Sequence, residues 1–450
     1  MANPLLQLLQ KNDKKGLFKG TFSSVSYPTE FATLDYRNGY VVQVTDANDN
    51  VIEVYPSIGI GGGTITTLVG ESQTGKSTLA IQMAYNIVKH FPAGFIQHYD
   101  LERSFDYARI KSLTGLKNHE FGDKYILQQH GTMEEILEAV NDIADTKQAN
   151  REIFEYNVGR KDIFGKDIVL LQPTIVLLDS LPMLETKDFK TDSIDSITAG
   201  GRKAIIIDQF YRKLTAICKP ANILVIIINH LKDKPQLSPR DFSKPGLVYA
   251  KSNKNIPGGK AVLFLSHQLM YLDRDTFLKE EEDGVDGYIN KVSFWKTRTN
   301  KAGQSCNLVF NQVKGYDKVM TLYQFAKENE LVEGRNPKRY FKGQKETGPY
   351  FDDRKIMDYL NGGDAQAEDM LRSLATITKP ELNKMLSVLD SSALEKIDNN
   401  MVKLLEEAPD CVEAATGIQK EYINPDIMEN FVKKILIGEY GYTMEEIGLE

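Results

Sequence analysis

The stretch GESQTGKST, Gly70 to Thr78, constrains the fold more than any other part of this 450-residue chain. It follows the apolar run TITTLV and precedes LAIQMAYNIVKH, which has the apolar spacing of an amphipathic helix. A glycine-containing turn between a buried strand and a helix is typical of a P-loop, whose main-chain N–H groups surround phosphate oxygens. The alternative is a glycine-rich helix cap that binds nothing.

The P-loop interpretation predicts a nucleotide site made of Gly70, Glu71, Ser72, Gln73, Thr74, Gly75, Lys76, Ser77 and Thr78. In such a loop the lysine contacts the β and γ phosphates, and the hydroxyl that follows it ligates Mg²⁺. We therefore expect Lys76 at the phosphates and Ser77 at the metal, with ATP and Mg²⁺ as cofactors.

Strand-like and helix-like segments alternate after this loop. Four apolar runs rich in β-branched residues are expected to be strands: ITTLVG, GFIQHYDLE, TIVLLDS and NILVIIINH. Helical patterns such as MEEILEAVNDIAD and IIIDQFYRKLTAICK lie between them. Continuous apolar runs are typical of strands covered on both faces. The order predicts an α/β fold with a mostly parallel, twisted central sheet flanked by helices.

Further strands are expected on both sides of this core. The segment YVVQVTDANDNVIEVYP predicts a hairpin around an Asn/Asp turn. After Lys260, the segments AVLFLSHQLMYLDR, YINKVSFWKTR and SCNLVFNQV predict successive strands that form an antiparallel extension.

The chain is expected to divide into an N-terminal arm (1–30), a core (31–340) and a small C-terminal helical region (341–450). The last fifty residues contain four lysines and eleven carboxylates, which accounts for the whole net charge of −7. The C-terminal region is therefore an acidic tail on a neutral body, and a neutral body can still carry a basic patch.

Composition favours a soluble intracellular protein. No apolar run approaches the ~18 residues of a membrane span, and no secretion signal is recognisable at the N-terminus. Cys218, Cys306 and Cys411 are odd in number and far apart, which fits neither a disulfide framework nor a zinc site. We expect a cytoplasmic protein without a membrane partner.

Three of the predicted strands end in polar side chains that could work with the P-loop. Asp179 ends TIVLLDS and is expected to hold Mg²⁺, although a lone carboxylate there is usually a helix cap. Glu102, two residues after Asp100, could deprotonate water or belong to a solvated acidic loop. His230 ends NILVIIINH and could sense the γ-phosphate or be a structural hydrogen-bonding residue.

The segment that follows His230 predicts contact with nucleic acid. From Leu231 to Lys260 there are seven basic residues against two acidic ones, in a long stretch rich in Pro, Ser, Asn and Gly. A loop of that length inside a compact domain is usually functional, and clustered cations attract a polyanion. The basic side chains expected at DNA are Lys232, Lys234, Arg240, Lys244, Lys251 and Lys254.

In FWKTRTNKAG, strand alternation places Lys296 and Arg298 on one face and Trp295 on the other. Two cations on one face predict either an anion site or an edge strand kept soluble by charge.

These motifs, in this order, resemble the RecA-type strand-exchange recombinases. The resemblance spans about residues 29–340 and is strongest to the phage UvsX-like branch. It comprises FATLDYRNG, the P-loop, YDLE, LLDS, INH, the basic segment, PGGKAVLFLSHQLMYLDR, KTR and GYDKVMTLYQFAKENELVEG. Residues 146–172 are longer than the family usually has at this place, which indicates an insertion, and the C-terminal helices match nothing in the family.

The resemblance implies a role for each matching position. Glu102 corresponds to the glutamate that activates water, and Tyr107 to the aromatic residue that stacks on adenine, at a shorter spacing than in bacterial members. His230 corresponds to the polar sensor that links ATP to the second DNA-binding loop, here about residues 232–259. The first DNA loop corresponds to about 183–203 and includes Arg202 and Lys203, which could equally begin a helix. Lys296 and Arg298 correspond to cations that reach the γ-phosphate of a neighbouring subunit.

The function implied is an ATP-dependent recombinase that forms helical filaments on single-stranded DNA and pairs it with double-stranded DNA. The subunits could form a ring without DNA, and single-strand-binding and loader proteins are expected partners. If the chain is phage-encoded, it acts in the cytoplasm of a bacterial host. Two alternatives remain: a hexameric replicative helicase on the same core, and a nucleotide-switched assembly protein without meaningful ATP turnover.

Overall fold

The computed structural model describes Lys11 and residues 25–341, except 47, 49, 164, 188–198, 234–253, 279–286, 329–331 and 336–337. The C-terminal region 342–450 and most of the N-terminal arm therefore lie outside the described residues, as do most of the two expected DNA loops. None of the described helices is long and apolar enough to cross a bilayer.

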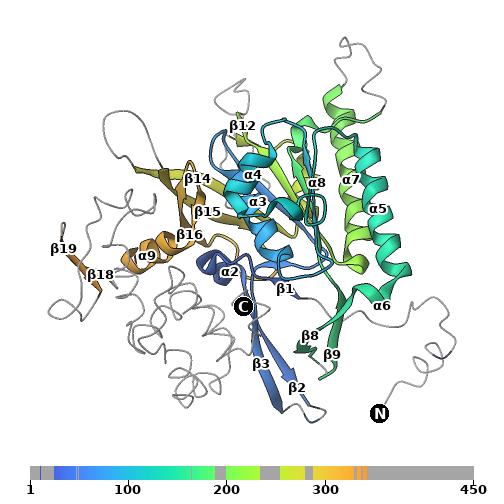
Figure 1. Cartoon of the computed structure of the whole chain (residues 1–450), viewed down its shortest axis with the longest axis horizontal. Coiled ribbons are helices and arrows are strands. Elements are labelled where there is room, and N and C mark those ends of the chain that lie inside the picture. Colours follow the sequence, from blue (N-terminus) through green and yellow to red (C-terminus); the bar gives the residue numbers. More distant parts are fainter. Residues whose placement is uncertain are drawn as a thin grey trace, which may run out of the picture.

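A nine-stranded sheet organises the molecule (Figure 1). Its order is β17 (Gly315–Asp317), β16 (Ser305–Asn311), β15 (Gly287–Lys296), β14 (Gln268–Leu278), β5 (Ile65–Gly70), β11 (Ile223–His230), β10 (Thr174–Asp179), β6 (Ile96–Asp100) and β7 (Tyr125–Gln128). The six strands from β14 to β7 are parallel to one another, and β15, β16 and β17 continue the sheet antiparallel. The predicted parallel sheet with an antiparallel extension is confirmed, although β7 was not predicted.

Helices cover both faces of the parallel strands, and others pack on the antiparallel extension. The described helices are α2 (Ala32–Asn38), α3 (Lys76–Val88), α4 (Tyr107–Thr114), α5 (Met133–Ala149), α6 (Arg151–Phe154), α7 (Ala199–Ala221), α8 (Gly259–Leu265) and α9 (Lys318–Glu328), with single 3₁₀ turns at Asn118–Glu120 and Leu181–Met183. One cluster of apolar side chains lies on the α3 side and the other on the α5 and α7 side.

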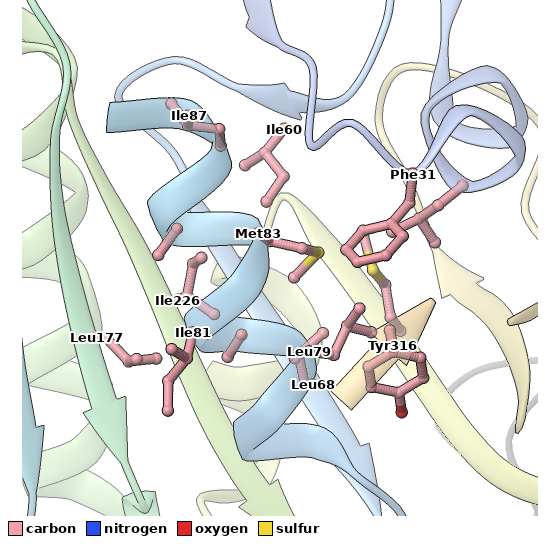
Figure 2. Close-up of a cluster of buried hydrophobic side chains, with 14 of the residues drawn as sticks. Phe31, Ile60, Leu68, Leu79, Ile81, Met83, Ile87, Leu177, Ile226 and Tyr316 are labelled. Atoms are coloured by element: carbon pink, nitrogen blue, oxygen red, sulfur yellow. The ribbon is translucent and has the colours of Figure 1, made fainter. Parts of the chain in front are cut away.

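Alternate residues of one strand enter the two clusters. In β11, Ile226 packs on the α3 side, whereas Val225 and Ile227 pack on the α5 and α7 side. Figure 2 shows Ile226 together with Ile81 and Met83 of α3. Because both faces are covered, a central strand needs apolar residues at every position, which explains the unbroken run NILVIII.

One predicted strand is wrong in its first half. In AVLFLSHQLMYLDR, the residues up to Leu265 form α8, and only those from Gln268 form β14. A short apolar run does not distinguish a strand from a buried helix. Here β14 is parallel to β5, so the chain must cross over the sheet, and α8 packs Ala261 and Val262 beside α7 on that crossover.

Among the described residues, five two-stranded sheets surround the core. They pair β1 (Ser26–Tyr27) with β4 (Ile60–Gly61), β2 (Tyr40–Thr45) with β3 (Val51–Ser57), β8 (Glu155–Lys161) with β9 (Asp167–Leu171), β12 (Lys232–Asp233) with β13 (Lys254–Asn255), and β18 (Val332–Arg335) with β19 (Lys338–Phe341). The predicted hairpin is β2–β3, and residues 146–172 form the end of α5, α6 and the β8–β9 hairpin (Figure 1).

The segment before α2 is fixed by a buried carboxylate. Glu30 is 5% exposed, and its side chain lies 2.7 Å from Lys89 and from His90 at the end of α3 and 2.6 Å from Lys318 at the start of α9. One carboxylate therefore ties three segments that are distant in sequence. A buried charge of this kind stabilises only while its partners are present, because removing one partner leaves the others uncompensated.

We expect Glu30→Gln to lower the free energy of unfolding by about 2–4 kcal/mol, because Lys89 and Lys318 lose their counter-charge. Urea unfolding followed by circular dichroism measures the change. Glu155→Gln is the matched control, since Glu155 pairs with Arg151 at an exposed site and its loss should cost less than about 1 kcal/mol. Equal losses in the two variants would contradict the role given to Glu30.

Candidate active site

The predicted P-loop lies at the carboxyl end of β5 and leads directly into α3. Gly75 precedes the helix with a φ of +74°, a left-handed conformation that glycine adopts without strain. A Cβ atom at Gly75 would lie 2.5 Å from the hydroxyl of Tyr316 and 3.2 Å from that of Tyr288. Backbone conformation and space therefore both require glycine here.

The outer side of the P-loop is held by the antiparallel extension of the sheet. The hydroxyl of Tyr288 in β15 donates to the carbonyl of Gln73 (3.0 Å). The amide of Asn290, also in β15, donates to the carbonyl of Thr74 (2.7 Å), which the hydroxyl of Tyr316 in β17 also contacts (3.3 Å). These residues were not predicted, because nothing in the local sequence shows that Asn290 is fully buried and faces the P-loop.

Lys76, at the start of α3, is buried and folded back onto the loop. Its ammonium group donates to the carbonyl of Glu71 (2.5 Å) and to the hydroxyl of Thr74 (3.4 Å). Burial lowers the pKa of Lys76 to about 8, and the carboxylates of Asp179, Glu102 and Glu71 oppose that shift. Additional negative charge at this position would favour the protonated form further, as expected for a phosphate-binding lysine.

Asp179 ends β10 beside the P-loop and is 1% exposed. Its side chain accepts a hydrogen bond from Ser77, and its Oδ2 atom has no hydrogen-bond partner in the described structure. Burial raises the pKa of Asp179 to about 7, and Glu102 and Asp100 add to the shift. The peptide bond between Asp179 and Ser180 is cis.

This pair of oxygen donors fits Mg²⁺. Mg²⁺ in nucleotide sites is bound through one or two protein oxygens and otherwise through phosphates and water. Ser77 and Asp179 supply a hydroxyl and a carboxylate side by side, and the second carboxylate oxygen of Asp179 is available. A cation would also remove the cost of ionising a buried carboxylate.

Asp100 and Glu102 have different surroundings. Asp100 is fully buried and accepts hydrogen bonds from the main-chain N–H of Phe105 (2.8 Å) and the hydroxyl of Ser104 (3.2 Å), so it fixes the turn after β6. Glu102 lies within that turn, and its Oε1 atom is 2.5 Å from the hydroxyl of Ser180 and 3.0 Å from Nε2 of His230. Glu102 is therefore accessible from the cleft described next, whereas Asp100 is not.

Lys76, Ser77, Glu102 and His230 line one cleft of about 890 Å³. Its lining includes the P-loop residues from Ser72 to Thr78, Glu102, His230, three phenylalanines (Phe105, Phe277, Phe310), two arginines (Arg109, Arg274), Ser104, Tyr288 and Gln312. The size is that of a typical nucleotide or drug-sized pocket. The arginines and phenylalanines were not predicted, because nothing in their local sequence marks them.

Tyr107, predicted to stack on adenine, lies at the first position of α4 and outside the lining of this cleft. Its ring is 47% exposed and packs edge-on against Phe121, with ring centroids 4.9 Å apart.

The stem of the predicted second DNA loop starts beside the site. His230 is followed by β12, which pairs with β13, so Lys232 and Asp233 lie beside Lys254 and Asn255. The amide of Asn229 donates to the carbonyl of Pro257 (2.8 Å), and Lys254 forms an ion pair with Glu71 of the predicted P-loop (2.8 Å). The two described flanks of the predicted loop therefore lie beside the predicted P-loop.

Among the other residues predicted to contact DNA, the structure describes the side-chain exposure of Lys232 only. Lys232 is exposed in β12. Arg202 and Lys203 lie in the first turns of α7, where side chains are not described, and Lys234, Arg240, Lys244 and Lys251 lie outside the described residues.

Lys296 and Arg298 lie away from the predicted P-loop of the same chain. Lys296 ends β15 level with Thr67 of β5, and Arg298 follows two residues later, because β15 is antiparallel to β5 and runs towards its amino end. The ammonium group of Lys296 donates to the carbonyls of Leu263, Phe264 and Ser266 (2.7–2.8 Å), and Arg298 donates to that of Phe264 (2.8 Å). Burial lowers the pKa of Lys296 to about 8, with a further contribution from Arg298.

No protein-family model matches the chain. Curated RecA proteins do: that of Ureaplasma parvum serovar 3 is 21% identical over 338 residues, covering 75% of this chain and 87% of that protein. The RecA protein of Clostridioides difficile strain 630 is 24% identical over 310 residues (66% and 76%), and that of Francisella tularensis subsp. novicida is 25% identical over 334 residues (73% and 80%). These similarities support a RecA-type recombinase, and the sheet and its helices are consistent with a RecA-like core.

The raised pKa of Asp179 predicts how stability depends on pH without Mg²⁺ or nucleotide. Its folded pKa of about 7 lies above its ordinary value of 3.8, so its contribution favours the folded state at low pH and is lost as pH rises through about 7. Asp179→Asn should therefore be more stable than the parent by on the order of 2 kcal/mol at about pH 8, and the difference should vanish towards about pH 4.

Urea unfolding at several pH values measures this difference. Asp142→Asn is the matched control, because Asp142 is exposed on α5 and its substitution should leave the pH dependence unchanged. A parent protein that is as stable as Asp179→Asn at about pH 8 would contradict the buried, ionisable carboxylate.

Proposed function

We propose that this protein is an ATP-dependent DNA recombinase of the RecA type, closest to the phage UvsX-like branch, that assembles on single-stranded DNA in the cytoplasm and promotes pairing and strand exchange. The observation that carries the proposal is the contact between Glu102 and His230. It joins the group suited to activate water to the strand that leads into the basic segment.

ATP hydrolysis would use the groups around the cleft. The P-loop N–H groups and Lys76 would bind the β and γ phosphates, and Ser77 and Asp179 would hold Mg²⁺. Mg²⁺ bound there would offset the negative charge of the phosphates. Glu102 accepts a proton from water as the water oxygen bonds to the γ phosphorus, and the bond from that phosphorus to the β–γ bridging oxygen breaks to give ADP and phosphate.

The positions of Lys296 and Arg298 support assembly of several copies of the chain. Neither Lys296 nor Arg298 lines the cleft at the predicted P-loop of the same chain, and both donate hydrogen bonds to carbonyls in or just after α8. They can meet a γ-phosphate only if it belongs to another copy. A head-to-tail contact of this kind is heterologous, and it gives an open helical filament when its rotation does not close a ring.

DNA binding would be coupled to the nucleotide through the stem of the basic segment. A γ-phosphate that changes the position of Glu102 also changes its contact with His230, and the ion pair between Glu71 and Lys254 joins the P-loop to the other end of the stem. Lys232, Lys234, Arg240, Lys244 and Lys251, with Arg202 and Lys203 at α7, are the proposed phosphate contacts on DNA. Contacts of this type bind the backbone and leave sequence recognition to base pairing.

The two alternatives differ in assembly. The similarity to RecA proteins does not favour a hexameric helicase, which would form closed rings around DNA. A nucleotide-switched protein without ATP turnover would not need a carboxylate, here Glu102, placed to activate water. Negative-stain microscopy with single-stranded DNA and a non-hydrolysable ATP analogue distinguishes filaments, rings and no assembly.

Glu102→Gln should retain ATP binding and filaments while DNA-stimulated hydrolysis falls by about 10²–10⁴-fold, because the amide cannot accept the proton. Filaments are scored by negative-stain microscopy and hydrolysis by phosphate release. Glu138→Gln, an exposed change on α5, should keep both properties. Hydrolysis that survives Glu102→Gln would show that another group is the base.

Complementation tests the action of Arg298 on a neighbouring subunit. Arg298→Ala and Lys76→Ala subunits should each lack turnover, since an arginine that acts on phosphoryl transfer contributes ~10³–10⁵ in rate. In an equal mixture, about a quarter of the interfaces join an intact P-loop to an intact Arg298, so turnover should return to about a quarter of the parent rate.

The control mixture replaces the Lys76→Ala subunit by one that carries both substitutions. It should regain nothing, because no interface then contains Arg298. Equal turnover in the two mixtures would refute action in trans.

A further inference from the structure

A second pocket lies at the amino end of β5, whereas the P-loop lies at its carboxyl end. It has a volume of about 320 Å³ and is lined by Gly61, Gly62, Thr64, Lys219, His267, Arg298 and Thr299, together with Val25, Ser26 and Tyr40. Its three basic side chains come from different elements: the last turn of α7, the turn between α8 and β14, and the residues after β15. The fold therefore gathers them from positions far apart in sequence.

The pocket is strongly cationic. None of its lining residues is acidic, and in the described part of the chain Lys219, His267 and Arg298 form no ion pair. Lys219 and Arg298 are exposed at its rim, and Lys296 lies close by. Burial, reinforced by Arg298, Lys219 and Lys296, lowers the pKa of His267 to about 4, so this imidazole is neutral near pH 7.

Its hydrogen-bond donors are largely unused. Lys219 donates to the carbonyl of Gly62 (3.3 Å) and Arg298 to that of Phe264 (2.8 Å), which leaves most of the ammonium and guanidinium N–H groups available. Nε2 of His267 is buried without a hydrogen-bond partner in the described structure. A buried polar nitrogen in that state indicates a missing partner.

We propose that this pocket binds a phosphate-class oxyanion through Lys219, Arg298 and His267. A tetrahedral oxyanion accepts hydrogen bonds in several directions at once, as three donors from three elements require. The site is separate from the P-loop, which lies at the other end of β5.

The oxyanion has two possible sources of the same chemistry. One is inorganic phosphate bound by a single subunit. The other is the phosphate chain of a nucleotide held by a neighbouring copy, and this source rests on the proposed function, since Arg298 is the cation expected to reach across the interface. In the second case Lys219 and His267 are additional residues of that half-site.

Phosphate binding to the Lys76→Ala protein tests the pocket with the lysine of the P-loop removed. Thermal unfolding is followed as inorganic phosphate replaces chloride at constant ionic strength, because a ligand that binds only the folded state raises its stability with concentration. We expect a saturable rise in Tm. Adding Lys219→Gln or His267→Gln should weaken the apparent affinity at least about tenfold.

Lys213→Gln is the matched control, since Lys213 is exposed on the same helix and does not line the pocket. It should leave phosphate binding unchanged. Melting in chloride alone shows whether each variant still folds, and two different substitutions guard against a local defect in one of them. No saturable effect, or equal affinity in Lys219→Gln and the parent, would overturn the proposal.

The two sources are separated in the mixed-subunit assay. Lys76→Ala subunits that also carry Lys219→Gln are combined with Arg298→Ala subunits. Loss of both phosphate binding and restored turnover assigns the pocket to a neighbour's nucleotide, and loss of phosphate binding alone assigns it to free phosphate. If restored turnover fails in every mixture while phosphate binding persists, the proposed trans action is wrong and the pocket stands.

Discussion

The parallel pairing of β5, β11, β10 and β6 is the constraint on which the candidate site depends. Its register places His230 beside Gly70 and Asp179 beside Asp100. Strands β5 and β11 therefore end at one level, as do β6 and β10, and each of the four ends in a polar or glycine residue. Because the strands are buried on both faces, these ends are the first places where a polar side chain can reach solvent or a ligand.

The antiparallel extension of the sheet, which contains no nucleotide-binding motif, holds the P-loop at these strand ends. Tyr288, Asn290 and Tyr316 bind the carbonyls of Gln73 and Thr74 and fill the space that Gly75 leaves. Holding a loop of this kind in place lowers the conformational entropy lost when phosphate binds. The antiparallel extension thus contributes to the P-loop as directly as β5 does, although it follows the P-loop by more than two hundred residues.

The parts of this molecule that could be predicted were those with a local signature. Apolar runs predicted the central strands, and the glycine and lysine pattern predicted the turn from β5 into α3 that we interpret as a P-loop, because both follow from short-range backbone and burial requirements. The helix α8 was taken for a strand, since a seven-residue apolar element has no decisive periodicity. Arg109, Arg274 and Phe277 could not be found, because only the folding of α4 and β14, which are distant in sequence, brings them to the cleft at the P-loop.

The division of charge between the two ends of the sheet has a further consequence. The end of the sheet with the predicted P-loop gathers Asp100, Glu102 and Asp179, together with Lys76, Arg109 and Arg274. The opposite end gathers Lys219, Lys296 and Arg298, and no acidic residue lines its pocket. Under the proposed function, a head-to-tail contact would bring these cations towards the carboxylates of a neighbouring copy, and such complementarity steers orientation. A symmetric dimer through the cationic end would instead oppose like charges. The sheet that aligns the proposed site therefore also supports the proposed direction of assembly.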